Sequence, residues 1–248
     1  DVSSQFVSAL LLVSPLAEKD MRIRLTTPLE SKPYVAMTLE CLAKFGVKVS
    51  VSEEMDDFVT SRQTYRSAGY EVEGDWSSAS YFLALGAVSG GVEVANLNPG
   101  SLQSDKAMLE FLRQMGAEVA VSSDKIRIKG SRLKALRADL TDCIDLLPTL
   151  AVLAAVAEGT SELAGINRAR LKESDRVAAV REGLARMGVK VIEEKDRMLI
   201  TGSKLKGAVI DSHNDHRIAM AFSVLGTLVG NTTINGAECV NKTFPEFW

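Results

Sequence analysis

Two short, strongly charged segments carry the side chains best suited to chemistry on anions. The first holds five charges in seven positions and includes Lys172, Glu173 and Arg176. Two cations at a helix start would bind phosphate, since the backbone N–H groups there also attract anions. Glu173 beside them could donate or accept a proton. The simpler interpretation is a solvated helix start, with Ser174 as its N-cap and Asp175 in its first turn.

The second charged segment, residues 212–217, directly precedes an apolar stretch. Asp215 suits the N-cap of a helix starting there, but capping does not explain why His216 and Arg217 enter an apolar helix. Because arginine is rarely buried without a partner, a bound carboxylate or phosphate would account for Arg217. His213 and His216 are spaced i, i+3 and lack an obvious third ligand, so we do not expect a metal site.

Two aspartates, Asp142 and Asp145, precede the most apolar run of the chain, residues 146–157. Helix capping would occupy one of them. An aspartate at the mouth of a buried helix also suits a general base. Both interpretations stay open at this point.

Weaker candidates lie in three other places. Lys242 stands among aromatic residues after a strand, and hydroxyl-rich helix starts occur at residues 3–5 and 31–34. Capping is the simpler explanation for the two helix starts. The sequence contains no GxGxxG, P-loop, HExxH or GxSxG motif, so nucleotide binding and serine nucleophile chemistry have no support.

The elements that must position these residues repeat along the chain. An amphipathic helix is predicted to end at Gly46, Gly116 and Gly188, which lie 70 and 72 residues apart. Glycine suits this end because it adopts the left-handed backbone at little cost. A short β-branched strand is expected directly after each glycine, and in the second and third copies a charged turn leads to another strand. Less charged helices alternate with these and are expected to be buried; they cover residues 4–13, 77–88, 146–157 and 218–229.

The repeating unit is therefore a buried helix, a strand, a loop, an amphipathic helix and two strands. The chain holds three copies and the start of a fourth, which predicts α/β (α+β) units packed around a core of buried helices. Residues 72–75, with Gly74, are the candidate crossing between two lobes; an ordinary β-turn is the alternative.

Composition narrows the class of protein further. The 248 residues are 46% apolar and 25% charged, which is typical of a globular protein and excludes disordered, collagen and coiled-coil classes. The net charge of -3 lacks the basic excess of a nucleic-acid binder. The three cysteines are far apart, so we expect a reducing compartment, the cytoplasm, and no disulfide framework or zinc site. The most apolar run is about half the length of a membrane span.

Six ordered motifs resemble those of the EPSP synthase (3-phosphoshikimate 1-carboxyvinyltransferase) family. They lie at residues 3–6, 31–34, 73–75 with 77–82, 172–176, 214–220 and 242–245. The resemblance covers essentially the whole chain and implies an inside-out α/β barrel of the enolpyruvyl transferase type, with two lobes. Residues 1–73 would be the remaining unit of an incomplete N-terminal lobe, and residues 74–248 the C-terminal lobe.

The resemblance also implies a reaction and a set of roles. The enolpyruvyl group of phosphoenolpyruvate would move to the 5-hydroxyl of shikimate 3-phosphate with release of phosphate, and without a metal or organic cofactor. Asp145 would take the proton of the 5-hydroxyl, and Glu173 would protonate the methylene carbon. The residues expected to bind shikimate 3-phosphate are Ser3, Ser4, Gln5, Ser31, Tyr34, Asp145 and Lys172. Those expected to bind phosphoenolpyruvate are Arg176, His216, Arg217 and Lys242.

The chain departs from the family pattern in two ways. The family's N-terminal portion, with its Lys-Ser motif, further basic residues and the glycine-rich loop associated with glyphosate, has no counterpart. We therefore expect little or no turnover from the 248 residues alone, the missing segment being truncated, cleaved or supplied by a partner chain. Arg168 stands where the family often has asparagine, which puts a substrate contact there in doubt.

Two alternative functions remain at the level of sequence. One is a UDP-N-acetylglucosamine enolpyruvyl transferase, which would share the fold but lack the motif at residues 172–176. The other is a non-catalytic module that binds anions or takes part in assembly. The expected partners in the preferred interpretation are the two small substrates, with neither nucleic acid nor membrane.

Overall fold

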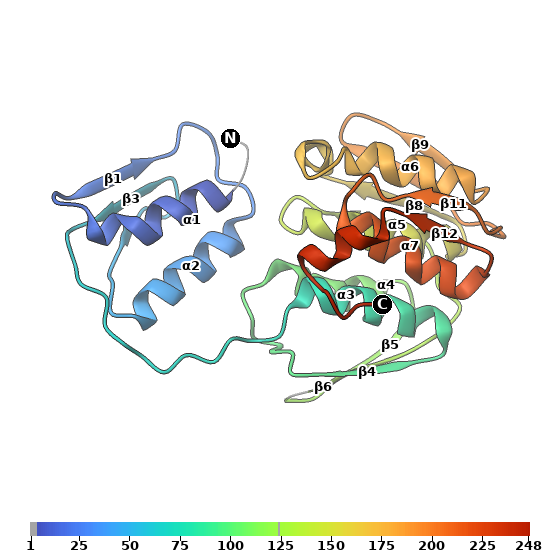
Figure 1. Ribbon diagram of the computed structural model, residues 1–248, viewed down its shortest axis with the longest axis horizontal. Helices are drawn as coiled ribbons and strands as arrows, with labels where there is room; N and C mark the ends of the chain where they lie inside the picture. Colours follow the sequence, from blue (N-terminus) through green and yellow to red (C-terminus); the bar gives the residue numbers. More distant parts are fainter. Residues whose placement is uncertain (1–3, 124) are drawn as a thin grey trace. The chain divides into compact units, whose positions relative to one another are not determined.

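The computed structural model describes residues 4–123 and 125–248, which form two compact units (Figure 1). The first unit contains the described residues up to Glu73 together with residues 100–104. The second contains residues 74–99 and 105–248. The assignment of the two units to lobes of a larger enzyme stays a prediction.

The first unit packs two helices on one antiparallel sheet of order β1-β3-β2. Its elements are α1 (Ser4–Val13), a 3-10 helix (Ser14–Leu16), β1 (Met21–Arg24), α2 (Lys32–Lys44), β2 (Ser50–Val51) and β3 (Asp57–Thr60). Val7 and Leu11 of α1 join Phe58 of β3 in a small core. The prediction that residues 4–13 form a helix is confirmed, but the expectation that this helix is buried is wrong within the unit. Its apolar Phe6 remains 66% exposed, because one helix and one short sheet cover only one of its faces.

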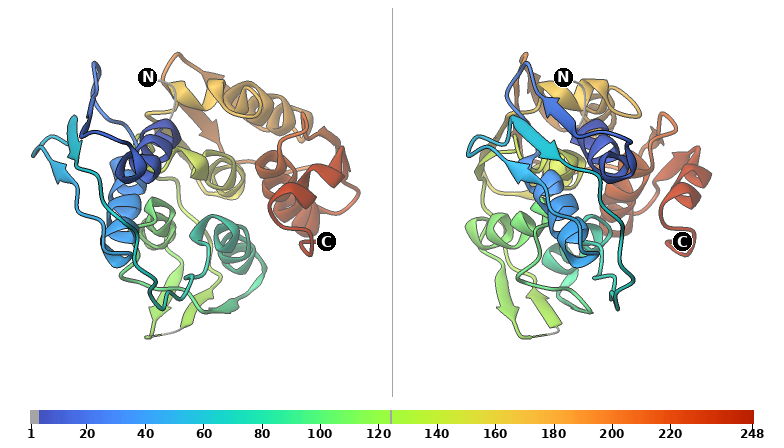
Figure 2. Two further views of the ribbon diagram at one scale, coloured as in Figure 1. Left: turned by 60° about the vertical axis from the view of Figure 1, so that its left-hand side comes forward. Right: turned by 90° about the vertical axis from the view of Figure 1, so that its left-hand side faces the viewer.

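The second unit is built around three helices that pack against one another, α3 (Trp76–Ser89), α5 (Leu147–Val156) and α7 (His216–Val229). Figure 2 shows them in the interior, with the sheets lying around them. The surrounding elements are β4 (Val92–Ala95), α4 (Met108–Gln114), β5 (Glu118–Val121), β6 (Lys125–Lys129), β7 (Arg137–Asp139), β8 (Thr160–Ala164), α6 (Arg176–Arg186), β9 (Lys190–Glu193), β10 (Arg197–Thr201), β11 (Val209–Asp211) and β12 (Thr233–Asn235), together with short 3-10 helices.

The predicted repeat is confirmed by the topology of the sheets. The orders β1-β3-β2, β4-β6-β5 and β8-β10-β9 are the same arrangement three times. The predicted hairpins β5–β6 and β9–β10 are antiparallel. The fourth copy begins as the third does, since β11 pairs in parallel with β12 around α7 as β7 pairs with β8 around α5. Parallel neighbours of this kind need a crossover connection, here a buried helix.

Two details differ from the sequence prediction. In the first copy the strand is Ser50–Val51 and does not start directly after Gly46. Gly74 is required by a close approach: a Cβ there would clash with the carbonyl oxygen of Asn96. Tight contact, more than backbone freedom, therefore explains this glycine.

Helix α5 shows why the most apolar run of the sequence is a core helix. Nine of its ten residues are buried, and a 3-10 turn (Ile144–Leu146) leads into it. Among the described residues, no helix has the length and apolar character needed to cross a bilayer. This apolar run therefore forms a helix in the protein interior, where it packs against α3, α6 and α7.

Candidate active site

Arg176 is the centre of the candidate site, at the first position of α6. Its side chain is 1% exposed. The N-cap of this helix is Asp175, whose carboxylate accepts the N–H of Ala178 at 3.0 Å. The prediction of Ser174 as N-cap is wrong, because the Ser174 hydroxyl instead donates to Asp215 at 3.0 Å.

Three carboxylates satisfy the buried guanidinium of Arg176. Its Nη1 donates to Asp145 Oδ1 at 2.7 Å, its Nη2 to Glu173 Oε2 at 2.6 Å, and its Nε to Asp215 Oδ2 at 2.8 Å. A buried arginine needs such partners, since an unpaired charge in the interior is strongly unfavourable. The partners of this buried guanidinium are thus supplied by the chain itself.

Asp215 connects the two charged segments of the sequence. It is fully buried, and its Oδ1 accepts the N–H of Arg217 at 2.9 Å, so the predicted N-cap of α7 is confirmed. Its other oxygen binds Arg176 across the helices. Burial opposes ionisation of Asp215, but Arg176 outweighs burial and holds the pKa of this carboxyl below its usual value.

Asp145 faces three cations. Its carboxylate lies 3.4 Å from Lys172 Nζ, 2.7 Å from Arg176 Nη1 and 3.2 Å from Arg217 Nη2. Burial alone would raise its pKa, but Arg217, Arg176 and Lys172 prevail and lower the pKa to about 2. The capping interpretation of the aspartate pair is wrong: in the described part of the chain the N-cap positions of the 3-10 turn and of α5 are Cys143 and Leu146, neither of which makes a side-chain cap, and Asp142 is exposed.

Glu173 is held between two cations at the mouth of the cluster. It pairs with Arg176 and, through Oε1, with Lys242 Nζ at 3.4 Å. Burial works against its charged form, yet Arg176 and the weaker effect of Lys242 leave the pKa of Glu173 below its usual value. His216 is buried beside this group, and burial together with Arg217 lowers its pKa.

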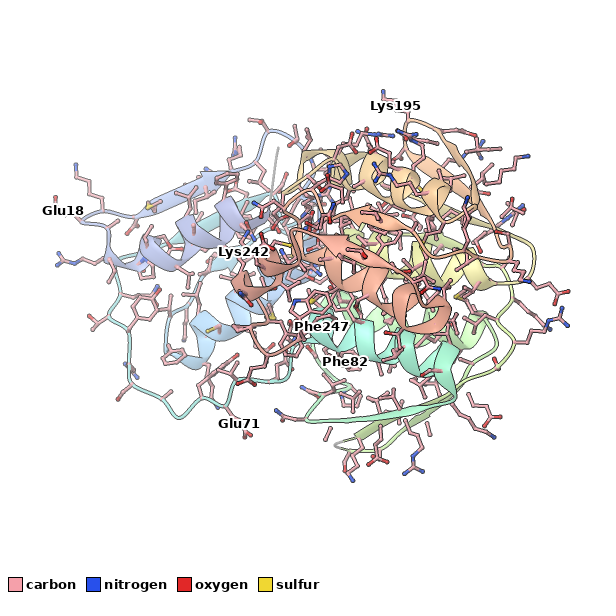
Figure 3. The ribbon with its side chains drawn as sticks, turned by 45° about the vertical axis from the view of Figure 1, so that its right-hand side comes forward. Glu18, Glu71, Phe82, Lys195, Lys242 and Phe247 are labelled. Atoms are coloured by element: carbon pink, nitrogen blue, oxygen red, sulfur yellow. The ribbon has the colours of Figure 1, made fainter. Side chains whose placement is uncertain are left out.

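Lys242 is placed by the C-terminal segment, which packs on α3. The ring of Phe82 lies 5.9 Å from that of Phe244 and 5.8 Å from that of Phe247 (Figure 3). The aromatic residues near Lys242 are therefore packing residues. Lys242 itself stays 63% exposed and is available to a ligand.

The structure brings most of the predicted site residues together and leaves others in the first unit. The second unit gathers Asp145, Lys172, Glu173, Arg176, His216, Arg217 and Lys242. In the first unit, Ser4 begins α1, Gln5 is exposed, and Ser31 and Tyr34 lie at the start of α2. Ser31 has a left-handed backbone (φ 53°), and its side chain does not cap that helix. Ser3 lies outside the described residues.

Asp105 is a member of this neighbourhood that sequence reasoning missed. It lies in a short 3-10 helix (Ser104–Ala107), fully buried, and its Oδ2 is 4.0 Å from Arg217 Nη1. Nothing in its local sequence marks it, because it is a single carboxylate between Ser104 and Lys106. Among the described residues, no three His, Cys, Asp or Glu side chains are grouped as a metal ion requires.

The arrangement suits binding and proton transfer on an anionic substrate. Four cations, Lys172, Arg176, Arg217 and Lys242, surround two carboxylates, Asp145 and Glu173. Arginine binds phosphate and carboxylate in a bidentate manner, and the two carboxylates are candidates for one base and one acid.

Comparison with known proteins connects this chain to one family. The family model described as EPSP synthase (3-phosphoshikimate 1-carboxyvinyltransferase) matches residues 1–248. Relatives named 3-phosphoshikimate 1-carboxyvinyltransferase include one from Dehalococcoides mccartyi (strain BAV1), 50% identical over 248 residues, and one from Clostridium kluyveri, 40% identical over 250 residues. Both alignments cover the whole of this chain and 59% of the relative.

A solved structure shows the same fold. The chain is similar to an EPSP synthase from Acinetobacter baumannii, with a TM-score of 0.82 and 30% sequence identity. The similarity covers 99% of this chain and 59% of that structure. The predicted class, the inside-out α/β fold, is confirmed by this likeness. The chain thus spans about three fifths of the length of the proteins that it matches.

Proposed function

Because the chain belongs to the EPSP synthase (3-phosphoshikimate 1-carboxyvinyltransferase) family, we propose that it provides the larger part of an enolpyruvyl transferase. The reaction transfers the enolpyruvyl group of phosphoenolpyruvate to the 5-hydroxyl of shikimate 3-phosphate and releases phosphate. One observation carries the proposal: the cations of the second unit converge on the two carboxylates that the family resemblance assigns to proton transfer.

Substrate binding in this proposal is an exchange of anions. Arg176, Arg217 and Lys242 receive the phosphate and carboxylate groups of phosphoenolpyruvate, and Lys172 receives shikimate 3-phosphate. These cations pair with Asp145 and Glu173 of the chain itself. The substrate therefore competes with internal carboxylates, and exclusion of water strengthens the new contacts.

The same exchange prepares the two carboxylates for proton transfer. A carboxylate whose pKa is about 2, as for Asp145, is a weak base. When anionic substrate groups share the charge of Arg176 and Arg217, the attraction on Asp145 weakens and its pKa rises. The pKa of Glu173 rises for the same reason once Arg176 and Lys242 turn to the substrate. Asp145 then accepts the proton of the 5-hydroxyl as its oxygen bonds to C2 of phosphoenolpyruvate, and Glu173 donates a proton to the methylene carbon. Phosphate then leaves from C2 and the methyl carbon gives up a proton, which restores the enol double bond.

The first unit has a binding role in the proposal. Ser4, Gln5, Ser31 and Tyr34 hold shikimate 3-phosphate, together with Ser3. The rest of the site lies in the part of the relatives that this chain does not span. The 248 residues alone are thus expected to bind substrate with little turnover, and a cytoplasmic location stays a prediction, checked by cell fractionation.

Calorimetry with purified chain tests the assignment of substrate. We expect binding of phosphoenolpyruvate and shikimate 3-phosphate, and no binding of UDP-N-acetylglucosamine. Binding of the UDP-sugar in place of shikimate 3-phosphate would move the chain to the other enolpyruvyl transferase family. Binding of inorganic phosphate with no preference for either substrate would support the non-catalytic module.

Turnover is tested by adding the part of a relative that this chain does not span. The N-terminal part of the Dehalococcoides mccartyi relative, supplied as a separate chain, should restore phosphate release from the two substrates. Glu173→Gln should bind phosphoenolpyruvate at least as well as the wild type, because it removes a competing negative charge, but should lose at least about a hundredfold in turnover. Glu93→Gln is the matched control, since Glu93 of β4 pairs with Arg127 and Lys125 of the neighbouring strand β6 and with none of the cations of the candidate site. Equal turnover of the Glu173 variant and the wild type would remove Glu173 from the mechanism.

A further inference from the structure

The guanidinium of Arg217 lies next to the buried carboxylate of Asp105. Asp105 is fully buried and accepts a hydrogen bond from the Ser77 hydroxyl of α3. The same hydroxyl accepts one from Arg217 Nη2 at 3.3 Å, and Asp105 Oδ2 lies 4.0 Å from Arg217 Nη1. The other oxygen of Asp105 makes no hydrogen bond with any described residue. A buried charge with so few partners stays ionised only through its cation, here Arg217.

The guanidinium of Arg217 therefore lies between two carboxylates of different kinds. Asp145, 3.2 Å from Nη2, is 21% exposed and belongs to the cluster that the substrates enter. Asp105 is 1% exposed and out of reach of a ligand. When a substrate binds Arg217 in place of Asp145, the contacts of Arg217 with Ser77 and Asp105 remain.

A small pocket lies beside Arg217. It has a volume of about 110 Å³ and is lined in part by Tyr81, His216, Arg217 and Thr243. Burial raises the pKa of Tyr81 to about 12 against the attraction of Arg217, so the guanidinium already lies close to this buried hydroxyl.

We propose that Asp105, together with Ser77, is a positioning residue that fixes the Arg217 guanidinium for phosphoenolpyruvate. The identity of the ligand rests on the proposed function, whereas the anchoring of Arg217 does not. Asp105 touches no substrate and acts only through Arg217. Orientation of this kind is what a bidentate arginine contact needs, because a small displacement of the fork loses one of its two hydrogen bonds.

The sign of one substitution separates positioning from simple electrostatics. Asp105→Asn removes a negative charge from behind an anion site, so charge alone predicts tighter binding of phosphoenolpyruvate. Loss of the ion pair that holds Arg217 Nη1, 4.0 Å from Asp105 Oδ2, predicts weaker binding, by about tenfold, because the guanidinium is no longer fixed in the orientation that the ligand needs. Ser77→Ala should weaken binding in the same direction, and Ser77→Thr, which keeps the hydroxyl, should restore it. Glu93→Gln is the control for the loss of one carboxylate of this unit.

A second measurement follows Arg217 without any substrate. Phenylglyoxal modification of the 248-residue chain, located by mass spectrometry, should be about tenfold faster at Arg217 in Asp105→Asn than in the wild type. Arg176, which has other carboxylate partners, should react equally slowly in both and serves as the internal reference. Circular dichroism and thermal unfolding confirm that each variant is folded.

The pH dependence adds a readout that a merely structural residue would not change. Burial raises the pKa of Asp105 to about 6 against the attraction of Arg217. The charged or titratable groups around it are Arg217 of α7, Asp145, Asp75, Tyr81 of α3 and Cys143. The ratio of affinities between wild type and Asp105→Asn should fall towards one as the pH drops below about 6. Titration of the ligand itself cancels in this ratio.

The outcomes separate this proposal from the proposed function. Faster modification of Arg217 with weaker phosphoenolpyruvate binding supports both. Faster modification in a chain that binds no phosphoenolpyruvate supports the anchor and overturns the proposed ligand. Unchanged modification of Arg217, or unchanged or tighter phosphoenolpyruvate binding in a folded Asp105→Asn variant, overturns the positioning role.

Discussion

Asp215 has two structural tasks, and the substitution Asp215→Asn separates them. The amide oxygen of asparagine can still accept the N–H of Arg217, so the N-cap of α7 is kept. The negative charge opposite Arg176 Nε, 2.8 Å away, is lost, and the Ser174 hydroxyl loses its charged acceptor. The variant therefore measures the pairing with the buried arginine.

The expected loss of stability depends on the carboxylate partners that Arg176 retains in the variant. Removing one partner of a buried ion pair costs about 3–5 kcal/mol of the free energy of unfolding. Arg176 retains Asp145 and Glu173, at 2.7 and 2.6 Å, so we expect a smaller loss of about 2–3 kcal/mol. In a chain of this size that loss lowers the melting temperature by about 4–12 °C.

Asp75→Asn is the matched control, because Asp75 caps α3 but is exposed and has no buried arginine. Since aspartate and asparagine cap equally well, this variant should lose less than about 0.5 kcal/mol. Urea unfolding, followed by the fluorescence of the buried Trp76, gives both values. If Asp215→Asn costs no more than Asp75→Asn, the argument that Asp215 stabilises Arg176 is refuted.

The pH dependence of this loss has a defined sign. The pKa of Asp215 is lowered in the folded chain, so its contribution is fully present above the ordinary carboxyl pKa near 3.8 and is lost as the pH falls towards the folded value. The difference between wild type and Asp215→Asn should accordingly shrink below about pH 4. A difference that stays constant down to pH 2 would contradict a charge effect.

Three other perturbations test separate parts of the structure. Gly183→Ala, which in an exposed helix would stabilise, should cost about 1–3 kcal/mol in thermal unfolding because its Cβ meets the ring of Phe222; a gain in stability would refute this packing. The wild type should lose about 3 kcal/mol of stability as the pH rises from 4 to 6, because the pKa of Asp105 is about 6 in the folded chain and lower in the unfolded chain, and Asp105→Asn should remove this loss; urea unfolding that gives the wild type and the variant the same change between pH 4 and pH 6 would count against it. Lys242→Met should weaken phosphoenolpyruvate binding about tenfold in calorimetry with stability unchanged within about 0.5 kcal/mol, because Lys242 is mostly exposed; unchanged binding would exclude it from the site.

Much of the fold could be predicted from local sequence. The glycine that ends each amphipathic helix recurs 70 and 72 residues on, and Gly116 and Gly188 do adopt a positive φ, of 91° and 90°. The alternating hairpin strands and the uncharged helices follow from the same local rules. The prediction of the N-cap of α6 failed because Ser174 donates to Asp215, the N-cap of another helix, and Asp175 caps α6 in its place.

The composition of the site was also visible, since charged residues that enter apolar helices need partners. Which carboxylate meets which cation was not. Arg176 binds Asp145 and Asp215, which are 31 and 39 residues away along the chain, and Arg217 reaches Ser77 over 140 residues. Local sequence patterns do not indicate which residues so far apart in the chain lie close together in the folded protein.

The amino-acid sequence thus determined the repeating units, their buried helices and the list of charged residues, because these depend on local propensity and on hydrophobic periodicity. Only the tertiary structure decided the pairing of those charges, the anchoring of Arg217 by Asp105 and the exposed face of α1. Each of these depends on which helices pack together and on how much water the packing excludes, and those quantities exist only once the chain is folded.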